Sequence, residues 1–208
     1  MAPHDAVAHI DNRDGAVTSK VALRRWVADW LDGRGRVLEV FCGQSAVMWA
    51  LAWRDHCASY VGIDAAQSHI EVRDVRVGDA MEEIAKLDLS AFDCIDVDAW
   101  GSPWRVVRAI ASVRRLAAGE RLGLVITDGS SKRRKFVGHV DDQRWFARDM
   151  PGVRTSASCV PVVVAGLRAT ARLMGARCGG MRRCEVGGGG GAKGNVQMSY
   201  AAALFEGR

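Results

Sequence analysis

The residues best suited to chemistry lie together from Asp96 to Pro103, where the chain reads Asp-Val-Asp-Ala-Trp-Gly-Ser-Pro at the end of a predicted strand. The exocyclic amine of a nucleic acid base is a poor nucleophile because its lone pair is delocalised into the ring. A carboxylate that accepts its N–H bonds helps to localise that lone pair, and an aromatic ring can stack on the base with roughly 1–3 kcal/mol. We therefore predict that Asp98 holds a target amine, that Trp100 stacks on its ring, and that Asp96 positions a cofactor or the loop. The same string predicts substrate contacts at Ser102 and Pro103.

A second group of candidates consists of residues that follow other predicted strands. In an open parallel sheet, ligands bind beyond the carboxyl ends of the strands. The first strand leads into Gly43, whose missing Cβ lets backbone amides approach a ligand. The second ends at Asp64, about 20 residues later, where a carboxylate can accept hydrogen bonds from both hydroxyls of a ribose. These positions predict a nucleoside-containing cofactor bound by Glu39, Phe41, Cys42, Gly43, Asp64, Ala65, Asp79, Ala80 and Asp96.

The elements that position these residues alternate between helical and strand patterns. Apolar residues at helical spacing predict a helix over 18–31. Short β-rich runs predict five strands, separated by helices, at 37–41, 59–63, 74–77, 92–97 and 122–127. Such alternation implies right-handed crossovers and a parallel sheet covered on both faces. Two last strands, at 181–186 and 196–204, are expected to form an antiparallel hairpin. The prediction is an α/β, Rossmann-like fold with a mostly parallel seven-stranded sheet and a C-terminal antiparallel hairpin.

The domain organisation follows from the same pattern. We expect a loose N-terminal leader over 1–17 and a single domain over 18–208, with a basic insertion at about 130–158. Because this insertion follows the fifth strand, it is expected to emerge at the ligand-binding edge of the sheet. It contains four consecutive basic residues that we predict to contact substrate phosphates, namely Lys132, Arg133, Arg134 and Lys135.

The string that begins at Asp96 resembles the motif of the tRNA guanine-N2 dimethyltransferase family, which reads approximately D-L-D-P-Y-G-S-P. The resemblance extends over roughly 37–128 and includes the Thr-Asp ending of the fifth strand. Ala99 and Trp100 stand where that family has proline and tyrosine, and the chain is too short for the family's C-terminal tRNA-binding domain. The resemblance implies a class I methyltransferase that uses S-adenosylmethionine (SAM), with Asp79 near the adenine amino group. It also implies methylation of a guanine amine in tRNA.

Composition limits the partners, the metal sites and the cellular compartment that we expect for the protein. Its 29 Lys and Arg against 24 Asp and Glu favour a polyanionic partner such as nucleic acid, although simple solubility explains the charge equally well. The six cysteines form no C-x-x-C pair and none lies near a histidine at metal-ligand spacing, which predicts reduced core thiols and no metal site. No apolar window has the length of a signal peptide or a membrane span, so we expect a cytoplasmic protein.

These features predict a SAM-dependent N-methyltransferase that acts on a nucleic acid base, with RNA, and the guanine amine of tRNA in particular, favoured over DNA. Two enzymatic alternatives stay open, a DNA amino-methyltransferase that flips its base and a small-molecule methyltransferase. An alternative from another class is a catalytically silent methyltransferase fold that binds RNA or a partner subunit. A purely structural interpretation of the same string also stays open, in which Asp98 forms a turn before Gly101 and Trp100 is a packing residue. A partner subunit or a homodimer also stays open.

Overall fold

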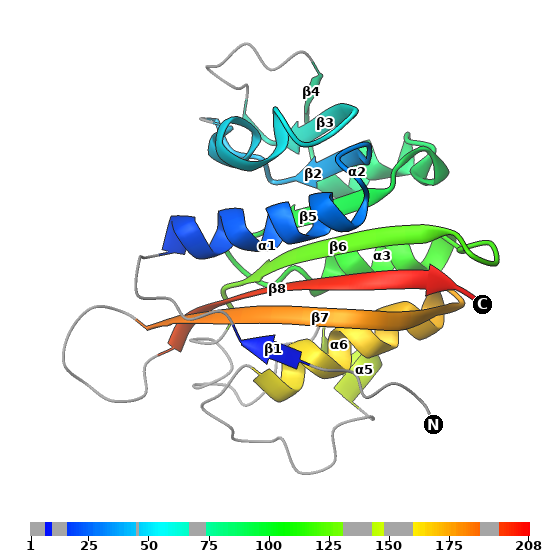
Figure 1. The fold of residues 1–208 in the computed structure, drawn as a ribbon. Coiled ribbons are helices and arrows are strands. Elements are labelled where there is room, and N and C mark those ends of the chain that lie inside the picture. Colours follow the sequence, from blue (N-terminus) through cyan, green and yellow to red (C-terminus); the bar gives the residue numbers. More distant parts are fainter. Residues whose placement is uncertain are drawn as a thin grey trace.

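A computed structural model describes residues 7–9, 16–44, 46–66, 74–130, 143–147, 160–187 and 196–208 (Figure 1). The helical elements in these ranges are α1 (Ala16–Trp30), the π-helical turn η1 (Trp49–Trp53), α2 (Ala80–Ala85), the three-ten turn η2 (Leu89–Ala91), α3 (Trp104–Val113), α5 (Arg144–Ala147) and α6 (Val160–Leu173). The strands are β1 (Val7–His9), β2 (Arg36–Val40), β3 (Ser59–Asp64), β4 (Val75–Val77), β5 (Cys94–Asp98), β6 (Arg121–Asp128), β7 (Ala176–Gly187) and β8 (Val196–Gly207). None of the helices described has the length and apolar character needed to cross a membrane.

The strands form one sheet in the order β1-β7-β8-β6-β5-β2-β3-β4. Strand β8 runs antiparallel to both of its neighbours, β6 and β7, whereas the other neighbouring pairs are parallel. The carboxyl ends of β2, β3 and β5 therefore meet at one edge, where Val40 pairs with Ile63 on one side and Val97 on the other. This arrangement confirms the predicted Rossmann-like α/β fold, in which five parallel strands are followed by an antiparallel pair.

The eighth strand departs from the prediction of seven. Strand β1 lies within the segment predicted as a loose leader over 1–17, and it pairs in parallel with β7, Val7 opposite Met181. Helix α1 also begins inside that segment, at Ala16. The physical reason is that β7 would otherwise be an edge strand, whose free N–H and C=O groups accept a further strand. The three residues of β1, Val-Ala-His, include only one β-branched residue and do not form the β-rich run by which the other strands were predicted.

Helices cover both faces of the sheet, with α1 and η1 on one face and α3, α5 and α6 on the other (Figure 1). Side chains alternate between the two faces along each strand. In β5, Ile95 and Val97 belong to the core on the α3 side, whereas Cys94 belongs to the core on the α1 side. The alternation therefore directs the two acidic residues of this strand, Asp96 and Asp98, toward α1.

Candidate functional site

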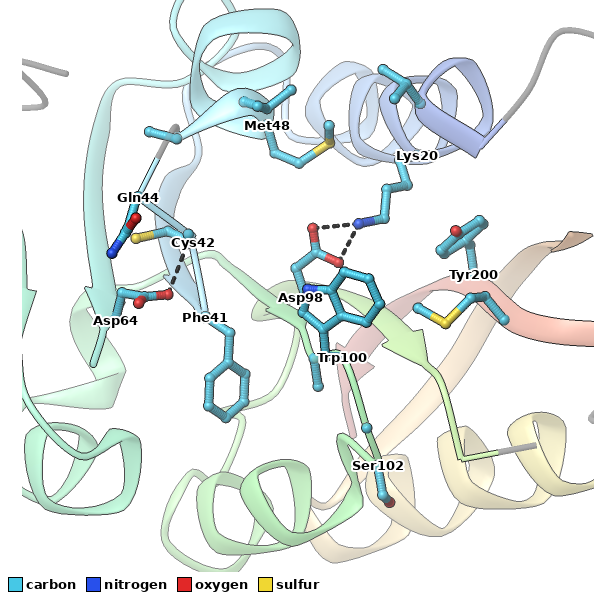
Figure 2. A pocket seen from close by; sticks show the side chains of 17 residues that line it. Lys20, Phe41, Cys42, Gln44, Met48, Asp64, Asp98, Trp100, Ser102 and Tyr200 are labelled. Carbon is cyan, nitrogen blue, oxygen red and sulfur yellow. Dashed lines mark hydrogen bonds and ion pairs between the residues drawn. The ribbon is translucent and has the colours of Figure 1, made fainter. Parts of the chain in front are cut away.

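A pocket of about 870 Å³ lies beyond the carboxyl ends of β2, β3 and β5, where a parallel sheet is expected to bind its ligand (Figure 2). The predicted site residues that line it are Phe41, Cys42, Gly43, Asp64, Asp98, Trp100 and Ser102. The lining also contains residues that sequence reasoning missed, among them Lys20 from α1, Gln44 and Met48 from the segment after β2, and Met198 and Tyr200 from β8. One cavity thus joins the predicted cofactor positions to the predicted substrate positions.

One end of the pocket is formed by the turn after β2, which is tied to the end of β3. Phe41 N–H donates to the Ile63 carbonyl at 2.8 Å, and Gly43 N–H donates to Asp64 Oδ2 at 2.8 Å. Phe41 and Gly43 have φ angles of 66° and 72°, and this left-handed backbone is strained for an aromatic residue. Asp64 Oδ1 accepts a further bond from Ala66 N–H at 3.1 Å. Because a carboxylate has about four acceptor positions, Asp64 retains capacity for ribose hydroxyls.

The other end of the pocket contains an ion pair between α1 and the end of β5. Lys20 Nζ lies 2.5 Å from Asp98 Oδ1 and 2.6 Å from Oδ2, and Figure 2 shows the ammonium facing the carboxylate. Arg24 Nη2 lies 3.5 Å from Asp98 Oδ2. Burial raises the pKa of Asp98, but the Arg24 guanidinium and the Lys20 ammonium outweigh burial and hold that pKa below the usual aspartate value. Asp98 is therefore an ionised hydrogen-bond acceptor at neutral pH.

Asp96 lies beneath the pocket rather than in its lining, and it is completely buried. Arg24 binds it through two contacts, Nε to Oδ2 at 2.6 Å and Nη2 to Oδ1 at 2.8 Å. Trp53 Nε1 also donates to Asp96 Oδ2 at 3.0 Å. Asp96 thus fixes Arg24, which in turn contacts Asp98. This arrangement fits the predicted positioning role of Asp96 and gives it no direct access to a ligand.

Glu39 is likewise completely buried and absent from the pocket lining. It accepts the O–H of Tyr60 at 2.7 Å. Burial and the nearby Asp96 carboxylate raise the pKa of Glu39 to about 8. The physical reason for its placement is that Glu39 precedes the last residue of β2 and faces the α1 side of the sheet. Glu39 is thus a largely protonated residue under the pocket, where the sequence predicted a cofactor contact.

Asp79 caps helix α2, and neither it nor the neighbouring Ala80 lines the pocket. Asp79 Oδ1 accepts the N–H groups of Met81 at 2.8 Å and Glu82 at 3.2 Å. This is the position at which aspartate stabilises a helix by satisfying otherwise unpaired donors. Ala65 is exposed and also absent from the lining. The capping bonds account for the acid at the end of β4 without a ligand.

The loop after β5 presents an exposed tryptophan to the pocket. Trp100 is 92% exposed although it belongs to the lining, so packing does not explain it. Ser102 also lines the pocket, and its Oγ accepts Trp104 N–H at 3.4 Å. Pro103 is buried and occupies the N-cap position of α3. Of the two predicted substrate contacts in this loop, only Ser102 borders the cavity.

Asp128, in the Thr-Asp ending of β6, holds the loop at the point where α3 begins. Asp128 is completely buried and accepts Trp104 Nε1 at 3.0 Å. It also accepts Ser130 N–H at 2.8 Å. The first bond ties the start of α3, where the loop that carries Trp100 ends, to the end of β6.

Other predictions concern the basic insertion and metals. The predicted phosphate contacts lie outside the described residues, and these are Lys132, Arg133, Arg134 and Lys135. In the part of the chain that the structure describes, no group of His, Cys, Asp and Glu side chains has the arrangement of a metal site.

Comparisons with known proteins show which proteins share this fold. No family model matches the chain, and no curated protein matches it. Among solved structures, a SAM-dependent methyltransferase from Archaeoglobus fulgidus matches with 13% identity and a TM-score of 0.53, covering 91% of this chain and 95% of that one. Trm1 from Pyrococcus horikoshii, in complex with SAM, matches with 14% identity and a TM-score of 0.53, covering 95% and 58%. Cofactor-bound Rv0187 from MTB matches with 16% identity and a TM-score of 0.52, covering 96% and 84%. The chain therefore has the fold of SAM-dependent methyltransferases.

Proposed function

We propose that this chain is a SAM-dependent N-methyltransferase that acts on a nucleic acid base, and that its target is the exocyclic amine of guanine in RNA. The observation that carries the proposal is the presence of Asp98 and Trp100 in one pocket of a methyltransferase fold. Asp98 supplies an ionised acceptor for an amine, and Trp100 supplies an exposed aromatic surface for a base.

The end of the pocket formed by β2 and β3 fits the adenosyl part of SAM. Asp64 keeps acceptor capacity for the ribose hydroxyls after binding two backbone N–H groups. A Cβ at Gly43 would meet nothing within 4 Å, so the backbone there is open to a ligand. When bound, SAM supplies an electrophilic methyl group. The matched structures from Archaeoglobus and Pyrococcus, both described by their use of SAM, support the same cofactor here.

Asp98 serves the target amine in this mechanism. Its oxygens accept the N–H bonds, which localises the nitrogen lone pair and fixes the direction in which it points. Such positioning can contribute about 7–11 kcal/mol toward an in-line displacement. The same oxygens can accept the proton that the nitrogen releases once it has gained a methyl group. Arg24 and Asp96 keep Asp98 in place from the buried side.

Replacing Trp100 with alanine should raise KM for the nucleic acid substrate by roughly 5- to 150-fold, because base stacking contributes about 1–3 kcal/mol. The Kd for SAM should stay unchanged within about twofold, since the side chain is 92% exposed and supports no core. Steady-state kinetics with varied RNA, together with calorimetric titration of SAM, measures both. Trp100→Phe keeps an aromatic face and should recover most of the loss; equal KM values for all three proteins would contradict the stacking role.

RNA is favoured as the substrate for two reasons. The motif that begins at Asp96 resembles that of the tRNA guanine-N2 dimethyltransferases, and Trm1 is among the solved structures with this fold. The chain spans only 58% of Trm1, so the substrate is proposed from the pocket and the motif together.

The proposed function is tested by transfer of labelled methyl from SAM to total RNA and to genomic DNA, followed by nucleoside analysis. Label in N2-methylated guanosine is the expected result. Label in an amino base of DNA would instead support the DNA enzyme. If SAM binds but neither polymer is labelled, the nucleic acid substrate is wrong, and small molecules or a silent fold become the explanation.

A further inference from the structure

Lys20 and Asp98 place a hydrogen-bond donor and an acceptor side by side in the pocket wall (Figure 2). The ammonium lies 2.5 and 2.6 Å from the two carboxylate oxygens. A side-chain carboxamide also carries a donor next to an acceptor, and asparagine and glutamine use this pattern to form bidentate pairs with base edges. The Lys20–Asp98 pair offers the same pattern, built from two residues that are far apart in the sequence.

Lys20 is not the only cation that holds Asp98. Arg24 Nη2 lies 3.5 Å from Asp98 Oδ2, and Arg24 is itself fixed by two bonds to the buried Asp96. Asp98 would therefore keep a cationic neighbour if the Lys20 ammonium turned part of its donor capacity toward a ligand. The lysine has three N–H donors and its side chain is 18% exposed, whereas the Arg24 side chain is 1% exposed. Of the two cations, Lys20 is the one that a ligand can reach.

Charge at this wall favours a neutral amine. Lys20 and Arg24 face the carboxylates of Asp98 and Asp96, so two cations balance two anions. An alkylammonium group would meet Lys20 as a like charge and would have to lose a proton before it could accept a methyl group. The exocyclic amine of a base is neutral at pH 7, and a ring nitrogen next to it is an acceptor with no proton. That edge matches both members of the pair.

Building on the proposed function, we infer that Lys20 is a specificity-determining residue of the substrate site. Asp98 accepts the N–H of the target amine, and Lys20 donates to the unprotonated ring nitrogen next to it. In guanine this ring nitrogen is N3, which lies beside the N2 amine. The pair thus selects an amino-substituted aromatic ring with an adjacent acceptor and rejects alkyl amines such as a lysine side chain.

The inference is tested with two RNA oligonucleotides that differ at one atom. One carries the guanine that the enzyme methylates, and the other carries 3-deazaguanine, in which C–H replaces N3. For the wild type, the loss of N3 should lower kcat/KM by about 10- to 100-fold, the range that a hydrogen bond to a charged group supplies. Lys20→Met should lower kcat/KM for guanine by a similar factor and should then show less than about a twofold difference between the two oligonucleotides.

Two controls separate this role from others. Lys86 is an exposed lysine at the C-cap of α2, where it pairs with Glu83, and Lys86→Met should keep the full sensitivity to the deaza substitution. Lys20→Gln retains a neutral donor and should recover part of that sensitivity, which a purely structural role would not produce. Thermal unfolding of both Lys20 variants confirms that they are folded before the kinetics are compared.

Three results would overturn the inference. Equal sensitivity to the deaza substitution in the wild type and Lys20→Met would show that Lys20 does not contact N3. A rise of about 10-fold or more in the SAM Kd of Lys20→Met would assign the lysine to the cofactor's carboxylate instead. A wild type that methylates no guanine RNA would overturn the proposed function together with this inference, whereas the first two results would leave the proposed function standing.

Discussion

Replacing Asp98 with asparagine is expected to lower kcat for methyl transfer by at least about 100-fold while the SAM Kd stays within about threefold. Asparagine has nearly the same shape, but it loses the negative charge and turns one acceptor oxygen into an NH2 donor. The target amine would then lose an acceptor, and Lys20 would face a donor in place of the oxygen now 2.5 Å away. Single-turnover methyl transfer to RNA and calorimetric titration of SAM measure the two quantities.

Asp93→Asn provides the matched control for this substitution. Asp93 pairs with Arg36 at 2.9 Å, at the opposite end of β5 from the pocket, and its loss should leave kcat unchanged. An Asp98→Asn protein that is folded and keeps kcat within about threefold would contradict the assigned role. A protein that instead loses SAM affinity would show that Asp98 serves the cofactor rather than the amine.

Replacing Arg24 with methionine is expected to lower the free energy of unfolding by about 3–5 kcal/mol, because it leaves a buried carboxylate without its cation. Asp96 is completely buried, and Arg24 supplies two of its three hydrogen bonds in the described structure. Methionine keeps the apolar volume of the arginine stem, so the loss of charge dominates. Urea unfolding at neutral pH measures the change.

The exposed pair between Arg36 and Asp93 serves as the control for Arg24. The Arg36 side chain is 46% exposed, and Arg36→Met should change stability by no more than about 1 kcal/mol. Adding Asp96→Asn to Arg24→Met should recover part of the lost stability, because the unpaired charge is then removed as well. A loss below about 1 kcal/mol in Arg24→Met would contradict the view that Asp96 depends on this arginine.

The order of the elements could be predicted because each strand is a short β-rich run separated from the next by a helical segment. The same logic places Gly43, Asp64 and Asp98, since residues that end parallel strands converge on one edge of the sheet. Their shared pocket follows from topology alone and needs no knowledge of side-chain contacts.

The charges in the pocket wall and beneath it were harder to predict because they come from segments far apart in the sequence. Lys20 and Arg24 lie on a helix whose spacing indicated only a core-facing element, yet they pair with residues more than 70 positions later. A signal did exist. Lys20 and Arg24 share the stripe of α1 that continues with the buried Val27, and Asp96 and Asp98 share one face of β5. Basic residues on a core-facing helix stripe and acidic residues on one face of a buried strand predict each other.

The acids at Glu39 and Asp79 show the limit of reasoning from strand ends. Glu39 lies one residue before the end of β2, so its side chain points into the core. Burial there raises the pKa of Glu39. Asp79 follows its strand but is used to cap α2. Sequence position alone could not separate a carboxylate that borders the cavity from one bound to its own helix.

Methyl transfer at this pocket is tested most directly by a crystal structure of the protein with S-adenosylhomocysteine, the product left when SAM gives up its methyl group. The ribose hydroxyls are expected on Asp64, the backbone of Gly43 against the ligand, and the sulfur turned toward Asp98 and Trp100. A ligand bound away from this pocket, or with its sulfur turned away from Asp98, would contradict the assignment of methyl transfer to this site.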